Sequence, residues 1–227
     1  MPNFIDLSHT IESGMITYKG LPAPLVCDFL SREDSRRHYD CGHEFLISRI
    51  AMVGNTGTYL DSPFHRFADG KDLSELPLDG LSHLDGVVIR RPHAQGLAVD
   101  TECFAGCDLR GKAVLVHTGW DAHWRTDRYF EQHPFLTEAA ARHLVAAGAR
   151  LVGIDSHNID DTRARSRPVH TVLLGAGVPI CEHMTNLGSL PDRGFDFFAV
   201  PPKVKAFGTF PVRAYARVKP AAEATTG

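Results

Sequence analysis

The sequence is short of the features that mark membrane, secreted and nucleic-acid-binding proteins. Nowhere do about 18 apolar residues follow one another, so the sequence predicts no membrane-spanning helix. The first residues include no basic segment followed by an apolar one, so we expect no signal peptide and a cytoplasmic protein. The net charge is only −3 and the basic residues are scattered, so we expect neither nucleic acid nor a membrane surface as a partner.

Cysteine is also scarce. The chain has 5 cysteines, an odd number, which together with the missing signal segment indicates reduced thiols. Cys103 and Cys107 lie close in sequence, but no second cysteine pair would complete a structural zinc site of that kind. The sequence therefore predicts neither a disulfide framework nor a thiolate-bound metal.

What the chain does have is the composition of an ordinary globular domain. It has 227 residues, 43% of them hydrophobic and 22% charged, which is enough to bury a core of normal size. We find no internal repeat, no low-complexity segment and no linker. We therefore expect a single domain over residues 1–227, with residues 220–227 forming a frayed tail.

Short apolar runs predict several strands and few helices. Residues 113–117 read Ala-Val-Leu-Val-His, which is typical of a strand buried on both faces. An alanine-rich helix is expected over residues 139–147, between an N-cap at Thr137 and a stop at Gly148. A strand at residues 150–155 would complete a βαβ unit. Further strands are expected at residues 44–53, 86–90, 178–182, 195–200 and 212–218, and a short helix at about 169–174. The fold class is α/β: a single mixed domain with central β-structure, few helices and long loops.

The segment with the most chemical information is Gly-Asn-Thr-Gly-Thr-Tyr-Leu-Asp-Ser-Pro-Phe-His at residues 54–65. Its glycines permit a tight backbone, and Pro63 stiffens its end. Asp61 and His65 lie close together within it. A carboxylate can bind a hard cation or orient a histidine, and histidine is the usual general acid or base near neutral pH. A structural turn beside a surface histidine would give the same pattern, so residue chemistry alone leaves both interpretations open.

A second pair of candidates is His170 and Glu182. The histidine begins the short predicted helix and the glutamate ends the next strand, so both could face one cavity. With Asp61, they make a reasonable set of ligands for a divalent metal. A helix-start histidine without any ligand role is the alternative for His170.

The remaining histidines are weaker candidates. His157 lies between two aspartates and could support the site, while His43 and His117 stand at predicted strand ends and could line the cavity. The other histidines outside the motifs are expected at the surface: His38, His83, His93, His123, His133 and His143.

The pattern Gly57-Thr58-x-x-Asp61-x-Pro63-x-His65 resembles the signature of the putative cyclase family, which includes kynurenine formamidases and isatin hydrolases. Other segments that resemble the family are residues 6–9, 69–70, 76–78, 115–120, 153–156, 170–187 and 211–213. The resemblance covers nearly the whole chain. It implies a homodimer or higher homo-oligomer, and two metal positions that share the aspartate.

The sequence departs from the family pattern at two positions. The family motif reads His-x-Gly-Thr-His-x-Asp-x-Pro-x-His, and here Asn55 and Tyr59 replace its first two histidines. An amide is a weak metal ligand, and a phenol must ionise from a pKa near ~10 before it binds well. We therefore expect one divalent metal, zinc or manganese, on Asp61, His170 and Glu182. The alternative is that no metal binds and that Asn55 and Tyr59 form a hydrogen-bonding pocket.

The resemblance implies a hydrolase that cleaves a carbon–nitrogen bond in a small-molecule amide, N-formyl amide or cyclic amide, as arylformamidases do in tryptophan-to-kynurenine catabolism. His65 would take a proton from water, Asp61 would hold the metal, and Asn55 or Tyr59 would donate a hydrogen bond to the developing oxyanion. One alternative is a lactone hydrolase or a cyclase/dehydratase that works by metal-free proton transfer, with Tyr59 as the acid. Another is a non-catalytic ligand-binding relative.

Overall fold

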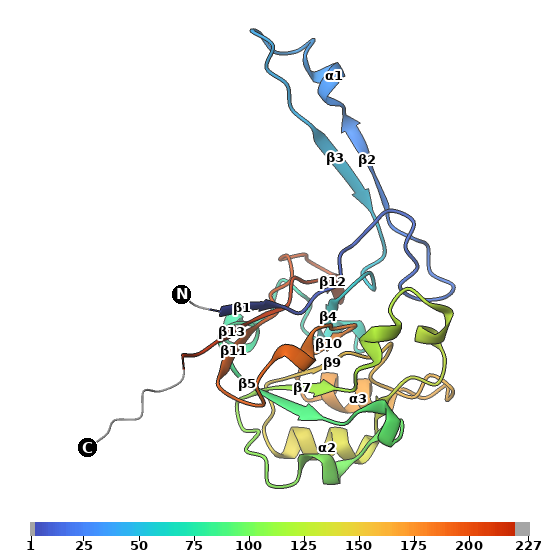
Figure 1. Cartoon of the computed structure of the whole chain (residues 1–227), viewed down its shortest axis with the longest axis vertical. Coiled ribbons are helices and arrows are strands. Elements are labelled where there is room, and N and C mark those ends of the chain that lie inside the picture. The colour runs from blue at the N-terminus through green and yellow to red at the C-terminus, as the bar shows by residue number, and fades with distance from the viewer. Residues whose placement is uncertain (1–2, 221–227) are drawn as a thin grey trace, which may run out of the picture.

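The computed structural model describes residues 3–220. A nine-stranded mixed sheet forms its centre (Figure 1). In spatial order, its strands are β1 (Asn3–Asp6), β13 (Tyr215–Val218), β11 (Phe195–Phe198), β5 (Leu84–Arg90), β7 (Ala113–His117), β9 (Leu151–Ile154), β10 (Ile180–Glu182), β4 (Tyr59–Asp61) and β12 (Thr209–Pro211). The pairings from β5 through β7 and β9 to β10 are parallel, and the outer pairings are antiparallel.

The helices and the core follow from the alternation of side chains along the central strands. In β7, Val114 and Val116 belong to the cluster that α2 (Glu138–Ala146) and α3 (Pro168–Gly175) cover, while Leu115 points into a second cluster on the other face. Every second side chain of a strand faces the same way, so a strand with a layer on each face must be apolar throughout. The expected α/β class with few helices and a single domain is confirmed.

The expected βαβ unit is confirmed as well. β7 and β9 are parallel neighbours, and α2 is the helix that joins them. The Thr137 hydroxyl accepts a hydrogen bond of 3.1 Å from the Ala140 amide and so caps the first turn of α2. Most predicted strands are shorter in the structure by one to three residues at an end, whereas β5 begins two residues earlier than predicted.

A hairpin stands away from this body (Figure 1). It consists of β2 (Leu25–Leu30), the short helix α1 (Arg32–Ser35) and β3 (Ile47–Ala51). All residues of β3 and most of β2 are exposed. The strand expected over residues 44–53 is therefore real, but it belongs to this arm and not to the central sheet. We refer to residues 25–51 as the arm.

Smaller elements complete the chain. β6 (Ala98–Val99) and β8 (Phe135–Leu136) form a separate two-stranded sheet. Short 3₁₀ helices lie at Pro63–His65, Leu78–Gly80, His93–Gln95, Thr101–Phe104, Trp120–His123, Asp127–Phe130 and Leu187–Ser189. Within residues 3–220, every helix is too short or too polar to cross a membrane. Most of the tail expected at 220–227 lies outside the described residues.

Candidate active site

The site is built on β4, a strand of three residues between β10 and β12. Antiparallel pairing places Glu182 opposite Tyr59 and Thr209 opposite Asp61. Residues directly opposite one another share a face of the sheet, and so do residues two apart in one strand. The register therefore brings four polar side chains from three distant segments onto one patch of the sheet.

The carboxylate of Glu182 is fixed at both oxygens. Its Oε2 accepts a hydrogen bond of 2.6 Å from the Tyr59 hydroxyl, and its Oε1 accepts one of 2.6 Å from the Ile159 amide. Burial, together with the negative charges of Glu182 and Asp61, raises the pKa of Tyr59 well above its ordinary value. The phenol thus stays protonated and acts as a donor that holds Glu182 in place.

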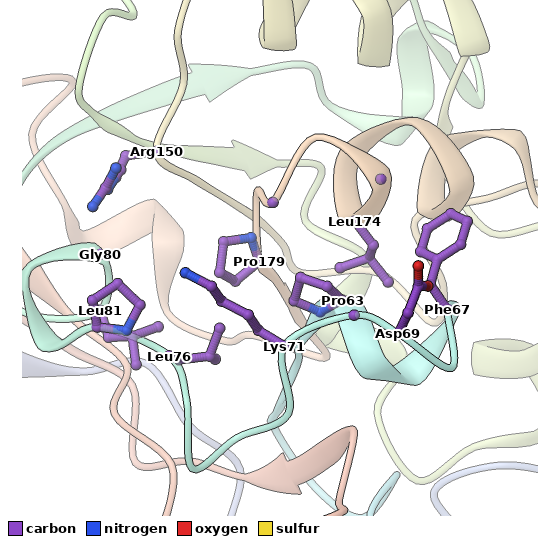
Figure 2. A pocket seen from close by; sticks show the side chains of 14 residues that line it. Pro63, Phe67, Asp69, Lys71, Leu76, Gly80, Leu81, Arg150, Leu174 and Pro179 are labelled. Carbon is purple, nitrogen blue, oxygen red and sulfur yellow. The ribbon is translucent and has the colours of Figure 1, made fainter.

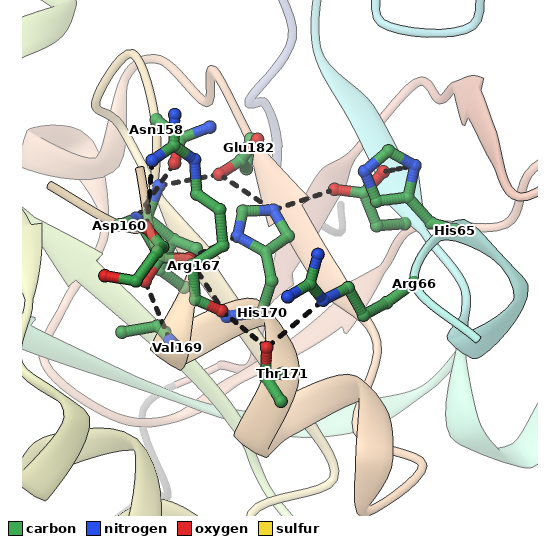
Figure 3. Close-up of polar contacts among 12 residues, drawn as sticks. His65, Arg66, Asn158, Asp160, Arg167, Val169, His170, Thr171 and Glu182 are labelled. Carbon is green, nitrogen blue, oxygen red and sulfur yellow. Dashed lines mark hydrogen bonds and ion pairs between the residues drawn. The ribbon is translucent and has the colours of Figure 1, made fainter. Parts of the chain in front are cut away.

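His170 reaches the same place from α3. Its Nδ1 lies 2.6 Å from Asp160 Oδ2. The Asp160 carboxylate also accepts hydrogen bonds from the backbone amides of Val169 and His170, at 2.7 and 3.0 Å. The carboxylate fixes the orientation of the ring and directs Nε2 toward Asp61 Oδ2 at 3.6 Å and Glu182 Oε1 at 3.7 Å. Figure 3 shows the ring between the carboxylates of Asp160 and Glu182.

Charge governs this cluster. Burial alone would lower the pKa of His170, but the negative charges of Glu182, Asp160 and Asp61 outweigh it and raise that pKa. Burial also raises the pKa of Glu182. Three buried carboxylates around one imidazole leave a surplus of negative charge, which favours a positive charge among them.

His65 is held by a chain of two hydrogen bonds. The Thr209 hydroxyl donates its proton to Asp61 Oδ1 and lies 2.7 Å from His65 Nδ1. Because the single hydroxyl proton goes to the carboxylate, the hydroxyl oxygen must accept a proton from Nδ1. The neutral ring then has its lone pair on Nε2. This is the arrangement of a general base with an orienting partner.

The donor set fits a divalent cation. Asp61 Oδ2 is buried and has no hydrogen-bond partner among the described residues, which is costly unless a cation or water satisfies it. Ligand atoms of Asp61, His65 and His170 lie within 4.8 Å of one another. Glu182 Oε1, next to His170 Nε2, adds another oxygen. Carboxylate oxygens with imidazole suit zinc or manganese.

A cavity of about 400 Å³ opens over these groups. Its lining combines catalytic candidates with polar and basic side chains: Tyr18, Lys19, Gly20, Leu21, Asn55, Tyr59, His65, Arg66, Asn158, Arg167, His170 and Glu182. A larger cavity of about 570 Å³ lies behind Pro63, against Leu76, Lys71 and Leu174 (Figure 2). It contains none of the candidate catalytic or metal-binding residues, so the smaller cavity is the candidate active site.

The predicted site residues all meet here. Asn55, Tyr59, His65, His170 and Glu182 line the cavity, and Asp61 lies beneath it. Their individual roles stay predictions. Sequence reasoning missed Thr209, Asp160 as the partner of His170, and the basic residues of the wall. Strand register places Thr209 in the site and a local turn places Asp160, and neither arrangement can be read from the sequence. The polar Asn158–Asp161 segment before α3 was a weak sequence signal for Asp160.

Some histidines lie elsewhere than expected. His43 lies in the arm, and the ring of His117 is held 3.1 Å from the Arg90 guanidinium, so neither lines the cavity. His133 is buried rather than exposed, because its ring contacts the Pro134 carbonyl and the Thr162 hydroxyl, both at 2.9 Å. His157 packs against Tyr18, a residue of the cavity wall.

The fold thus places His65, with its orienting partner, beside a cluster that can hold a divalent cation. The family model described as Putative cyclase matches residues 5–161, more than half of the sequence. The chain belongs to the putative cyclase family.

Several relatives and solved structures agree with this assignment. A kynurenine formamidase of Geobacillus thermodenitrificans is 30% identical over 174 residues, 75% of this chain and 79% of the relative. One of Maricaulis maris is 25% identical over 97% of this chain and 100% of its own. Isatin hydrolase A of Labrenzia aggregata, bound to benzyl benzoate, shares the fold with a TM-score of 0.82 at 22% identity, covering 96% of this chain and 94% of that one. A structure described as a potential metal-dependent hydrolase with cyclase activity has a TM-score of 0.79 at 25% identity, covering 97% and 100%.

The hydrogen-bond chain through Thr209 gives a direct prediction. Thr209→Val keeps the shape of the side chain but removes its hydroxyl, so His65 loses the acceptor that selects its Nδ1–H form. In ¹⁵N–¹H spectra of the histidine rings, the wild type should show His65 with its proton on Nδ1, and the valine variant should show a mixture. Thr209→Ser retains the hydroxyl and serves as the control. An unchanged His65 signal in the valine variant would contradict the proposed proton arrangement.

Proposed function

We propose that this protein hydrolyses the carbon–nitrogen bond of an amide, an N-formyl amide or a cyclic amide. The observation that carries the proposal is the Asp61–Thr209–His65 chain, which leaves His65 Nε2 as a base beside the Asp61, His170 and Glu182 cluster. Relatives named kynurenine formamidase support the amide or formamide as the reacting group. The substrate is a small molecule, in keeping with the volume of the cavity.

In this reaction, His65 takes the proton from the attacking water and later delivers it to the leaving nitrogen. Thr209 and Asp61 keep the ring oriented through both transfers. Asn55 lies in the cavity wall and donates a hydrogen bond to the developing oxyanion. Tyr59 contributes mainly by holding Glu182, because its hydroxyl is already engaged there.

One divalent cation, zinc or manganese, would be held by Asp61, His170 and Glu182. When bound, a cation of this kind polarises the carbonyl group and lowers the pKa of water. The unpartnered oxygen of Asp61 and the convergence of His170 Nε2 with Asp61 and Glu182 support this ligand set. His65 Nδ1 donates to Thr209, so the lone pair of the ring lies on Nε2, and we assign that atom the role of the base.

The metal-free alternative, in which Tyr59 acts as a proton-donating acid, has less support. The Tyr59 phenol is 1% exposed, it donates to Glu182, and burial raises its pKa. A phenol that gives up its proton with this difficulty is a poor general acid.

Replacement of the base should stop catalysis without stopping metal binding. His65→Ala should lower kcat for hydrolysis of N-formyl anilides by roughly 10²-fold or more, the usual contribution of a general base. It should bind zinc or manganese as the wild type does. His143→Ala, at an exposed histidine of α2, is the control and should change neither property. A His65→Ala enzyme that turns over at the wild-type rate would refute the role.

Replacement of a metal ligand should weaken metal binding, which replacement of the base should leave unchanged. After dialysis and re-addition of zinc or manganese, we expect one equivalent on the wild type by elemental analysis. Glu182→Ala should bind at least ~10-fold more weakly, since even the loss of an outer partner of a ligand costs about that much. Asn55→Ala should bind as the wild type does. Equal binding by Glu182→Ala and wild type would show that the ligand set is wrong.

The arm supports a homodimer as the working form. Large apolar side chains project from it, each 41–74% exposed: Leu25, Val26, Phe29, Phe45, Leu46, Ile47 and Ile50. Together they present on the order of 600 Å² of apolar surface, close to the roughly 800 Å² that each partner buries in a standard interface. A lone two-stranded hairpin is also marginally stable in water, so a second copy that packs against it stabilises both.

This assembly can be tested by light scattering coupled to size-exclusion chromatography. The wild type should elute with twice the mass of the chain, and Phe29→Asp, at a side chain 74% exposed in the arm, should elute as the monomer. Leu78 is another large hydrophobic side chain, 65% exposed, that lies on the body outside the arm. Leu78→Asp is therefore the control and should remain dimeric. A dimer that persists in Phe29→Asp, or a monomeric wild type, would contradict an interface made by the arm.

A further inference from the structure

The wall of the active-site cavity carries positive charge above its acidic base. Among the described residues that line it, the basic ones are Lys19, Arg66 and Arg167, and the acidic one is Glu182 at the base. The chain as a whole has a net charge of −3, so this wall is locally opposite in sign to the molecule. A concave surface lined by one sign of charge concentrates ligands of the other sign.

The three basic residues differ in how they are engaged. Lys19 forms an ion pair with Asp127 at 3.4 Å and lies over the ring of Phe130. Within residues 3–220, neither Arg66 nor Arg167 has a carboxylate within 4.0 Å. The two guanidinium groups are therefore the part of the wall that can accept an anionic ligand.

Arg167 is the better placed of the two. It is half-buried, and its Nη1 donates to the carbonyls of Ala164 and Ser166 at 2.5 and 3.0 Å. These contacts fix the group and use the Nη1 end alone. Its Nε and Nη2 edge donates to no carboxylate or carbonyl among the described residues, while the Tyr18 hydroxyl contacts the guanidinium. That edge presents two parallel N–H groups, the geometry that binds a carboxylate through both oxygens.

Arg66 is linked to Arg167 through Thr171 of α3. Its Nε donates to the Thr171 hydroxyl at 3.2 Å, and that hydroxyl donates to the Arg167 carbonyl at 2.7 Å. Thr171 directly follows His170 in α3. Figure 3 shows the two guanidinium groups on either side of the His170 ring. Both arginines are thus held at a fixed offset from the groups that would act on a substrate.

We propose that Arg167, assisted by Arg66, binds a carboxylate of the substrate, so that the amide cleaved at this site is an anionic one. This inference rests on the proposed function and names the substrate class for it. The carboxylate lies against the guanidinium edge, the scissile amide faces His65, and Tyr18 and Leu21 contact the body of the molecule between them. Arg167 acts as a specificity residue and takes no part in proton transfer.

The test uses two substrates with the same scissile bond, N-formylanthranilate and formanilide, which differ by one ring carboxylate. The wild type should favour the anionic substrate in kcat/KM by roughly 10- to 100-fold, the effect of a charge-assisted hydrogen-bonded pair. In Arg167→Gln, the ratio of the two kcat/KM values should fall toward one, chiefly through a higher KM for the anion. Arg167→Lys should recover part of the ratio. Arg165→Gln, at an exposed arginine of the same loop outside the cavity lining, should keep the wild-type ratio.

A binding measurement separates this inference from the proposed function. Titration calorimetry should show anthranilate binding to the wild type at least tenfold more tightly than aniline, with the difference lost in Arg167→Gln. If neither formyl substrate is hydrolysed, the N-formyl amide form of the proposed function fails, and calorimetry alone decides whether the anion site exists. If Arg167→Gln keeps the wild-type preference in both measurements, the anion site is refuted.

Discussion

The site depends on the compensation of buried negative charge. Asp61, Asp160 and Glu182 are each at most 1% exposed, and all three surround the ring of His170. A carboxylate removed from water is costly unless hydrogen bonds and a positive charge accompany it. Most of the local architecture supplies these partners, including the Tyr59 hydroxyl, the Thr209 hydroxyl and the backbone amides at the start of α3. The pocket is thereby prepared for a cation.

The sheet is what makes this arrangement rigid. β4 lies between two strands that pair with it along all three of its residues, and its neighbours contribute Glu182 and Thr209 in fixed register. A shift by one residue would turn Tyr59 and Asp61 to the opposite face, away from His170. Catalytic groups carried on strands in this way are placed more accurately than groups carried on loops. His65 comes from the 3₁₀ helix that follows β4, and Thr209 anchors it back to the sheet.

The sequence predicted the parts of this site that are local and missed those that depend on pairing. Asp61 and His65 belong to one short motif, His170 begins one helix and Glu182 ends one strand, so the sequence alone indicated their chemistry. Thr209 is 148 residues from Asp61, and no pattern in its own segment marks it. Likewise, the apolar run before the motif was identified as a strand, but nothing in it distinguishes a strand of the core from the exposed β3. The missing information was in each case the identity of a distant neighbour.

The position of β12 has a consequence for the order in which the protein matures during synthesis. Thr209, its first residue, follows Asp61 by 148 residues, yet this strand completes the pairing of β4 and brings in the hydroxyl that orients His65. Contacts between segments so far apart form late, because a long loop must close before they are made. A nascent chain that ends between β10 and β12 already contains Asp61, His65, His170 and Glu182, but the ring of His65 has no Thr209 hydroxyl beside it. The orientation of His65 therefore waits for a strand made 148 residues after Asp61.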